Sequence, residues 1–99
     1  MSTKIKLGPT HLLCSDVVPM NDRIDHVREV QFRLPKFKKP PTVSATIYSI
    51  DSPGNVIVIW SIEKDISGIE TIITISATSP DGVANPFKYF CDYVVIGEI

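Results

Sequence analysis

Residues 37–62 read FKKPPTVSATIYSIDSPGNVIVIWSI, and this stretch decides the fold. From Val43 to Ile50, apolar and small residues alternate with polar ones at the two-residue period of a β-strand. The segment Asp51-Ser52-Pro53-Gly54-Asn55 predicts a chain reversal, because proline presets φ and glycine accepts a positive φ. Val56 to Ile62 is almost wholly apolar and rich in β-branched residues, which fit a pleated sheet. We therefore expect a hairpin whose second strand is central and covered on both faces.

The chain before this hairpin holds weaker signals. Lys4 to Leu7 alternates and ends at Gly8-Pro9, which predicts a short edge strand closed by a turn. Thr10 to Met20 has no sustained period and is interrupted by Ser15-Asp16 and Pro19, so we expect it to be irregular with at most one short strand. From His26 to Leu34 the pattern alternates again and predicts a half-exposed strand. A helix stays open as an alternative there, since Val27, Val30 and Leu34 also have a helical spacing.

After the hairpin, two further strands are predicted. Ile69 to Ala77 alternates, with Ile72 as the one apolar residue on the polar side, which indicates contact with another element or another subunit. Tyr93 to Ile96 gives the final strand. About six strands separated by turn signals predict an all-β fold, a small antiparallel β-sandwich. With 99 residues and 11.0 kDa, we expect residues 1–99 to form a single domain.

Charge is divided unevenly along the chain. Residues 1–50 carry eight Lys and Arg against four Asp and Glu, and residues 51–99 carry two against seven. Either basic and acidic side chains are interspersed over the surface of the folded sandwich, or basic strands of one subunit contact acidic loops of the next. The three cations Lys36, Lys38 and Lys39 indicate either a solvated crossover that protects a sheet edge or an anion-binding patch. A net charge of −1 without a basic stripe interleaved with aromatics argues against a nucleic-acid partner.

The sequence offers few side chains that could together form a catalytic or metal-binding site. His11 and His26 lie in different segments, and neither has a neighbouring cysteine or serine in a nucleophile setting. Asp16, Asp22 and Asp25 do not match a calcium loop, and no glycine-rich phosphate loop is present. We therefore expect no enzyme activity, no metal and no cofactor.

Cys14 and Cys91 show neither metal-ligand nor redox spacing. They either stay reduced and buried or meet if the first and last strands are neighbours. The first residues lack the apolar region of an export signal, and no apolar run reaches the length of a membrane span. We expect a soluble chain without membrane insertion.

A series of short motifs runs through residues 28–97. They are Val30-Gln31-Phe32, Phe37, Pro40-Pro41-Thr42-Val43, Ser49-Ile50-Asp51, Asn55, Ile62, Ser67-Gly68-Ile69 and Tyr93-Val94-Val95-Ile96-Gly97. This order resembles the H-type lectin domain. The resemblance implies a six-stranded antiparallel sandwich, assembled as trimers or pairs of trimers, with sugar held at loops where subunits meet. Similar domains occur in the tails and fibres of bacteriophages.

The resemblance also implies where a ligand would bind. Asp51 and Asn55 are candidate sugar contacts, although both residues are also turn formers. The loop from Ser79 to Tyr89 adds Asp81, Lys88 and Tyr89, the last as a ring that stacks on a sugar face.

The chain departs from the family at its sugar-binding positions. Ile57 stands where the family has an arginine that donates to sugar hydroxyls. Ser76-Ala77-Thr78 lacks the family's tryptophan, and the closing strand has Tyr93 or Val94 where a further tryptophan is expected. The resemblance therefore implies the fold and the trimer more directly than a sugar specificity.

These observations lead to two functional expectations. The first is a non-enzymatic, oligomeric module of a phage-like virion, assembled in bacterial cytoplasm with other virion proteins, for receptor attachment or structural assembly. The alternative is a soluble, extracellular lectin that binds a cell-surface glycan between subunits.

Overall fold

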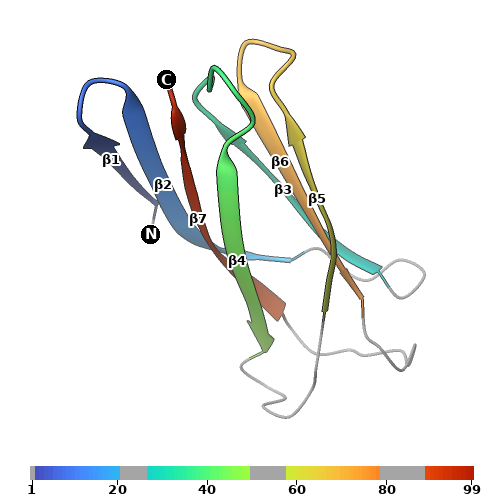
Figure 1. Cartoon of the computed structure of the whole chain (residues 1–99). Helices are drawn as coiled ribbons and strands as arrows, with labels where there is room; N and C mark the ends of the chain where they lie inside the picture. The colour runs from blue at the N-terminus through green and yellow to red at the C-terminus, as the bar shows by residue number, and fades with distance from the viewer. Residues whose placement is uncertain (1, 21–26, 50–57, 79–88) are drawn as a thin grey trace.

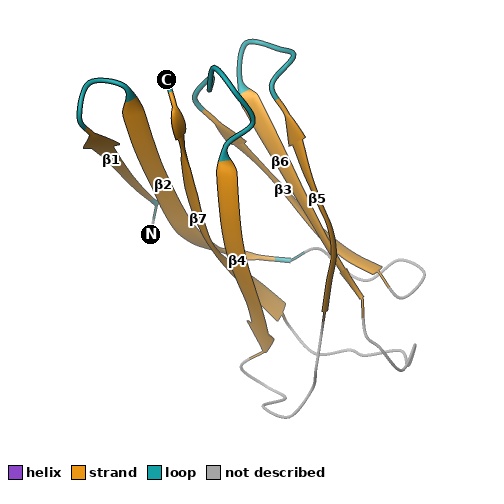
Figure 2. Ribbon diagram, in the orientation of Figure 1, coloured by secondary structure: helices purple, strands orange, loops and turns teal. Residues whose placement is uncertain are grey.

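A computed structural model of the chain describes residues 2–20, 27–49, 58–78 and 89–99. Its secondary structure in these residues is entirely β, with turns and loops between the strands (Figure 2). The strands are β1 (Thr3–Leu7), β2 (His11–Pro19), β3 (Val27–Leu34), β4 (Thr42–Ser49), β5 (Val58–Asp65), β6 (Thr71–Thr78) and β7 (Tyr89–Glu98). The described part thus holds seven strands where the sequence predicted about six.

The strands form two antiparallel sheets that face each other as two layers (Figure 1). The first sheet has the order β1-β2-β7-β4, and the second has the order β3-β6-β5. The predicted all-β sandwich is therefore confirmed. Because β2, β7 and β4 lie over the second sheet and β1 continues beyond β2, β1 is an outlying edge strand (Figure 1).

Alternation along the strands explains which side chains enter the core. Val43, Ala45 and Ile47 of β4 point inward, while Ser44, Thr46 and Tyr48 point outward, as the sequence predicted. In β3, Val30 and Leu34 are buried, Phe32 is half-buried, and Gln31 and Arg33 are exposed, so the strand is confirmed and the helical alternative is excluded.

The core lies between the two sheets. Phe37, from the loop between β3 and β4, is fully buried, and its backbone N–H donates to Thr71 Oγ1 at 3.0 Å. The rings of Phe32 and Tyr93 stack across the two layers with centroids 3.9 Å apart. The buried apolar residues are Leu12, Cys14, Met20, Val30, Leu34, Phe37, Ile73, Ile75, Ala77, Tyr89, Cys91, Tyr93 and Val95.

Three predictions about individual strands are corrected. The segment from Thr10 to Met20 is not irregular, because β2 runs through it for nine residues. The strand with Val58 is not central, because β5 lies at an edge of the three-stranded sheet and β6 occupies the middle, and it forms no hairpin with β4, which belongs to the other sheet. Ile69 does not belong to the buried face of β6, since it precedes that strand and is 92% exposed.

Candidate functional site

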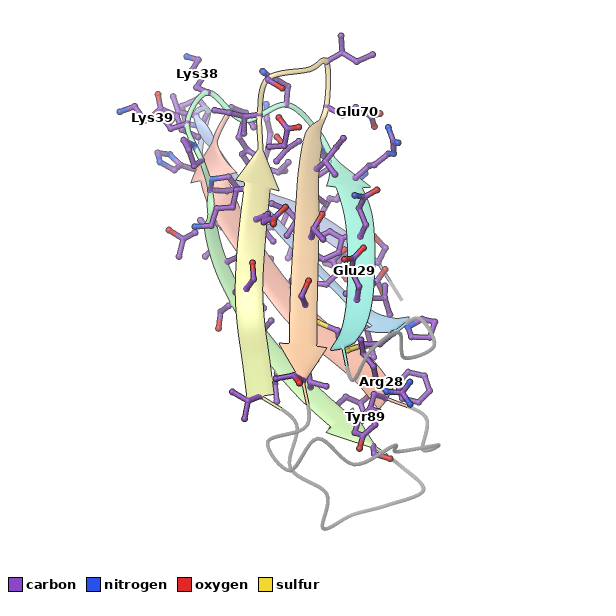
Figure 3. The ribbon with its side chains drawn as sticks, turned by 90° about the vertical axis from the view of Figure 1, so that its right-hand side faces the viewer. Arg28, Glu29, Lys38, Lys39, Glu70 and Tyr89 are labelled. Carbon is purple, nitrogen blue, oxygen red and sulfur yellow. The ribbon has the colours of Figure 1, made fainter. Side chains whose placement is uncertain are left out.

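The outer face of the three-stranded sheet is largely polar, as expected for a sheet surface in water, although Val58 and Ile72 also lie on it. Figure 3 looks onto this face, where Glu29 lies on β3. Gln31 of the same strand donates from Nε2 to Thr74 Oγ1 at 3.2 Å. Arg33 forms an ion pair of 3.7 Å with Glu70.

The outer face of the four-stranded sheet has the opposite character. Its most exposed apolar side chains are Ile5, Leu7, Val17, Val94 and Ile96, and Leu13 lies half-buried among them. We call these six residues the apolar face. Large side chains such as these are the ones that a strand normally turns inward, so this sheet carries apolar groups on both sides.

Strand register places the apolar face in continuous rows. Ile5 pairs with Leu13, and Leu13 pairs with Ile96, so three aliphatic side chains cross β1, β2 and β7 in one line. Directly paired residues of antiparallel strands share a face, with Cβ atoms about 5 Å apart. Near the other end of the same face, the rings of Tyr48 and Phe90 stack with centroids 5.8 Å apart.

The orientation of β1 is the most informative feature of this surface. Lys4 pairs with Cys14, whose side chain points into the core, so Lys4 and Lys6 lie on the side of the second sheet. Ile5 and Leu7 consequently lie on the outer side. An edge strand that served only the core would have the reverse alternation, because a shift of one residue exchanges the two faces.

A buried cation lies at the opposite end of the sandwich from the turn between β1 and β2. The guanidinium carbon of Arg28 lies 4.7 Å from the centroid of the Tyr89 ring (Figure 3). Arg28 is the second residue of β3 and Tyr89 begins β7, so this cation–π contact joins the two sheets. Arg28 is only 6% exposed and Tyr89 only 2%.

Of the five sequence-predicted ligand residues, only Tyr89 lies in the described part of the chain. Its ring is buried in the single chain and faces Arg28, so it presents no open face to a sugar in this arrangement. Asp51, Asn55, Asp81 and Lys88 lie outside the described residues.

The strands that flank these four residues end together. Ser49 pairs with Tyr89, and Val58 pairs with Thr78. The ends of β4 and β6 and the starts of β5 and β7 are therefore at one end of the sandwich (Figure 1). Residues 50–57 and 79–88 both connect to that end.

The two cysteines lie on neighbouring strands, but not opposite each other. Cys14 pairs with Val95 of β7, whereas Cys91, four residues from Val95 along β7, pairs with Val18. At about 3.3 Å per residue the two Cα atoms are about 13 Å apart, which is too far for a disulfide. Both thiols are buried and free. Burial raises the pKa of both, and the pKa of Cys91 reaches about 11.

One lysine of the loop between β3 and β4 links this loop to a neighbouring turn. Lys36 donates from Nζ to the carbonyl oxygens of Ile66 and Gly68, in the turn between β5 and β6. Lys38 and Lys39 are exposed at this end of the molecule (Figure 3). The anion-binding alternative stays a prediction for these two residues.

In the turn between β5 and β6, Ser67 donates to Asp65 from both its backbone N–H and its hydroxyl. These hydrogen bonds hold the pKa of Asp65 below its ordinary value.

No family model, curated protein or solved structure matches this chain. Among the residues described, no group of three or more His, Cys, Asp and Glu side chains is placed to hold a metal ion. None of the described segments forms a helix that could cross a membrane.

Sequence reasoning missed the apolar face, although one signal for it was present. The alternation of Lys4 to Leu7 separates two cations from two aliphatic residues, but it does not say which side faces the core. That assignment requires the register with β2, because Leu12 and Leu13 are both apolar and each is a suitable core residue on sequence grounds.

Proposed function

We propose that this protein is a non-enzymatic β-sandwich module that functions as a homo-oligomer in receptor attachment or structural assembly. The observation that carries the proposal is the apolar face on the outside of the four-stranded sheet. A sandwich already buries its core between the sheets, so aliphatic residues on an outer face mark a surface that another protein surface covers. Self-association would also help a domain of this small size to bury enough apolar area.

The setting that we propose is a phage-like virion, where the module contacts other virion proteins or a host receptor. The support is the resemblance of residues 28–97 to the H-type lectin domain, which also occurs in tail fibres. The same resemblance supports a trimer or a pair of trimers.

Size-exclusion chromatography with multi-angle light scattering tests the proposal first. We expect a mass that is a multiple of the 11.0 kDa chain at micromolar concentration. A chain that stays folded and monomeric under these conditions would count against the proposed oligomeric role.

A carbohydrate-binding function is the second candidate. It is favoured by the strand ends, which connect the segments with Asp51, Asn55, Asp81 and Lys88 to one end of the sandwich. Groups that converge at one end of a scaffold are suited to a shared ligand site.

A glycan array distinguishes the two functions. If the protein is a lectin, Asp51→Ala abolishes glycan binding, whereas Glu63→Ala, on the exposed outer face of β5, leaves binding unchanged. Absence of binding by a well-formed oligomer would favour the structural role.

A further inference from the structure

We infer that the apolar face docks onto the same face of a second copy, related by a two-fold axis that runs along the strands between β2 and β7. The inference rests on the proposed function, because both require self-association. It adds the surface, the symmetry and the residues that face each other.

The two outer faces of the sandwich differ in character. The three-stranded sheet presents Glu29, Gln31 and Arg33 outward from its edge strand β3. The four-stranded sheet presents Ile5 and Leu7 outward from its edge strand β1. The first face also carries Val58 and Ile72, but the second carries aliphatic residues in a row across three neighbouring strands. Both faces belong to one molecule under one selection for solubility, so this difference indicates that the second face is the covered one.

The orientation of β1 also favours a covered outer face. This strand lies beyond the second sheet, so turning Ile5 and Leu7 toward that side would leave them without a core to enter. On the outer side they extend the row that begins with Leu13 and Ile96. The strand therefore enlarges the apolar face and contributes its lysines to the other side.

The area of the four-stranded sheet bears on whether a second copy can cover it. Four strands at about 4.8 Å and a length of about 26 Å give a face of about 500 Å². Two such faces together cover about 1,000 Å², which is the lower limit for a specific interface between proteins. Full overlap of the two faces therefore just reaches this limit.

The residues of β2 and β7 that would face each other across this axis are partly complementary. A two-fold axis along the strands between β2 and β7 places each residue of β2 over the residue of β7 that is its partner in the ladder. Leu13 of one copy then lies over Ile96 of the other, and His11 lies over Glu98. Leu13 and Ile96 form an aliphatic pair and His11 and Glu98 an imidazole–carboxylate pair across the axis, as an isologous contact requires. Val94 lies over Ser15, and Val17 lies over Asp92.

Asp92 marks the end of the contact along the strands. It lies on the same face, between Val17 and Thr46 and beyond Val94. Twisted sheets that pack face to face are rotated by about 30° and separate away from the centre of contact. With the contact centred on Leu13 and Ile96, water reaches this carboxylate.

The test compares two valines on different sheets. Val94 is 37% exposed on the apolar face, and Val58 is 48% exposed on β5 of the other sheet. We expect the wild type to have twice the mass of one chain or another even multiple. Val94→Lys is expected to halve this mass, and Val58→Lys to leave it unchanged, both measured by light scattering after chromatography.

Ile5→Lys provides a second variant, because Ile5 lies on the edge strand and outside the core. If Val94→Lys fails to give the circular dichroism of a folded sheet, Ile5→Lys decides, and it too is expected to halve the mass.

Other results would overturn the inference. An oligomer whose mass neither Val94→Lys nor Ile5→Lys changes, or an odd number of chains, rules out the two-fold contact but leaves the proposed oligomeric function standing. A monomeric wild type overturns both. A monomer that co-sediments with phosphatidylcholine vesicles, and loses this binding in Val94→Lys, assigns the face to lipid instead.

Discussion

At the scale of single residues, Arg28 shows how a charge is accommodated between two sheets. Its guanidinium lies against the Tyr89 ring, and the residue as a whole is only 6% exposed. A buried arginine contributes through the packing of its methylene groups as well as through its charge. Arg33 has the same chemistry on the same strand, but its side chain is 63% exposed. The two arginines form a matched pair for measurement.

We expect Arg28→Ala to lower the free energy of unfolding by about 1–3 kcal/mol, because it removes a desolvated cation–π contact and leaves a void. Arg33→Ala is expected to change it by less than about 0.5 kcal/mol, since exposed ion pairs contribute little. Urea denaturation of both variants checks this. Equal losses in the two variants would contradict a special role of the buried cation.

The buried thiol of Cys91 leads us to expect a loss of stability at alkaline pH. Burial raises the pKa of this thiol from 9.0 to about 11, and the neighbouring Asp92 adds to the shift. Because the folded chain holds the proton more tightly, the stabilisation is complete below pH 9 and is lost as the pH rises to about 11. Burial also raises the pKa of Tyr93 to about 12, which has the same sign at still higher pH.

The measurement is the free energy of unfolding of the wild type and of Cys91→Ala between about pH 8 and pH 11. We expect the wild type to lose about 1–2 kcal/mol more than the variant over this range. Parallel curves for the two proteins would show that this thiol does not govern the alkaline limit.

At the scale of elements, the strands that sequence reasoning located are those with one apolar and one polar side. The alternation of β3 and β4 identified both their type and their inward residues. In β2, the inward Leu12 and Cys14 are interrupted by outward Leu13 and Val17, so no period was visible. The outward apolar residues of β2 therefore masked the alternation by which this strand could have been predicted.

The position of β5 was wrong for a related reason. Its apolar beginning predicted a central strand, but Glu63, Lys64 and Asp65 at its other end are exposed and suit an edge. An apolar run reports the burial of a strand, not its place in the order of a sheet. The candidate ligand residues depended on a family resemblance, since local patterns do not show which loops meet.

The loop between β3 and β4 is packed tightly against the end of β7. A Cβ atom on Gly97 would lie 2.5 Å from Phe37 Cδ1 and 2.9 Å from Pro41 Cβ. We expect Gly97→Ala to lower the free energy of unfolding by about 1–3 kcal/mol through overpacking.

Gly68→Ala is the matched control, because nothing lies within 4 Å of a Cβ at that position. Its effect is expected to be near zero or slightly stabilising. Thermal unfolding of both variants provides the comparison. A tolerated Gly97→Ala would show that Phe37 has room to move.

At the scale of the whole molecule, self-association links stability to concentration. If copies cover each other's apolar face, only the folded state binds, and mass action favours it. A hundredfold increase in protein concentration above the dissociation constant is expected to stabilise the assembly by about 2–3 kcal/mol. The midpoint of thermal unfolding should then rise by several degrees. A midpoint independent of concentration would indicate that the single sandwich is the stable unit.

The order of strands has a consequence for synthesis on the ribosome. The chain passes between the sheets after β2, β3, β4 and β6, and among the described strands β7 is the only sheet partner of β4. While residues 89–98 are still inside the exit tunnel, β4 has no ladder to join and β2 has only its hairpin with β1. Stalled nascent chains that stop before Tyr89 should therefore be cut readily by protease, and resistance should appear abruptly once β7 emerges.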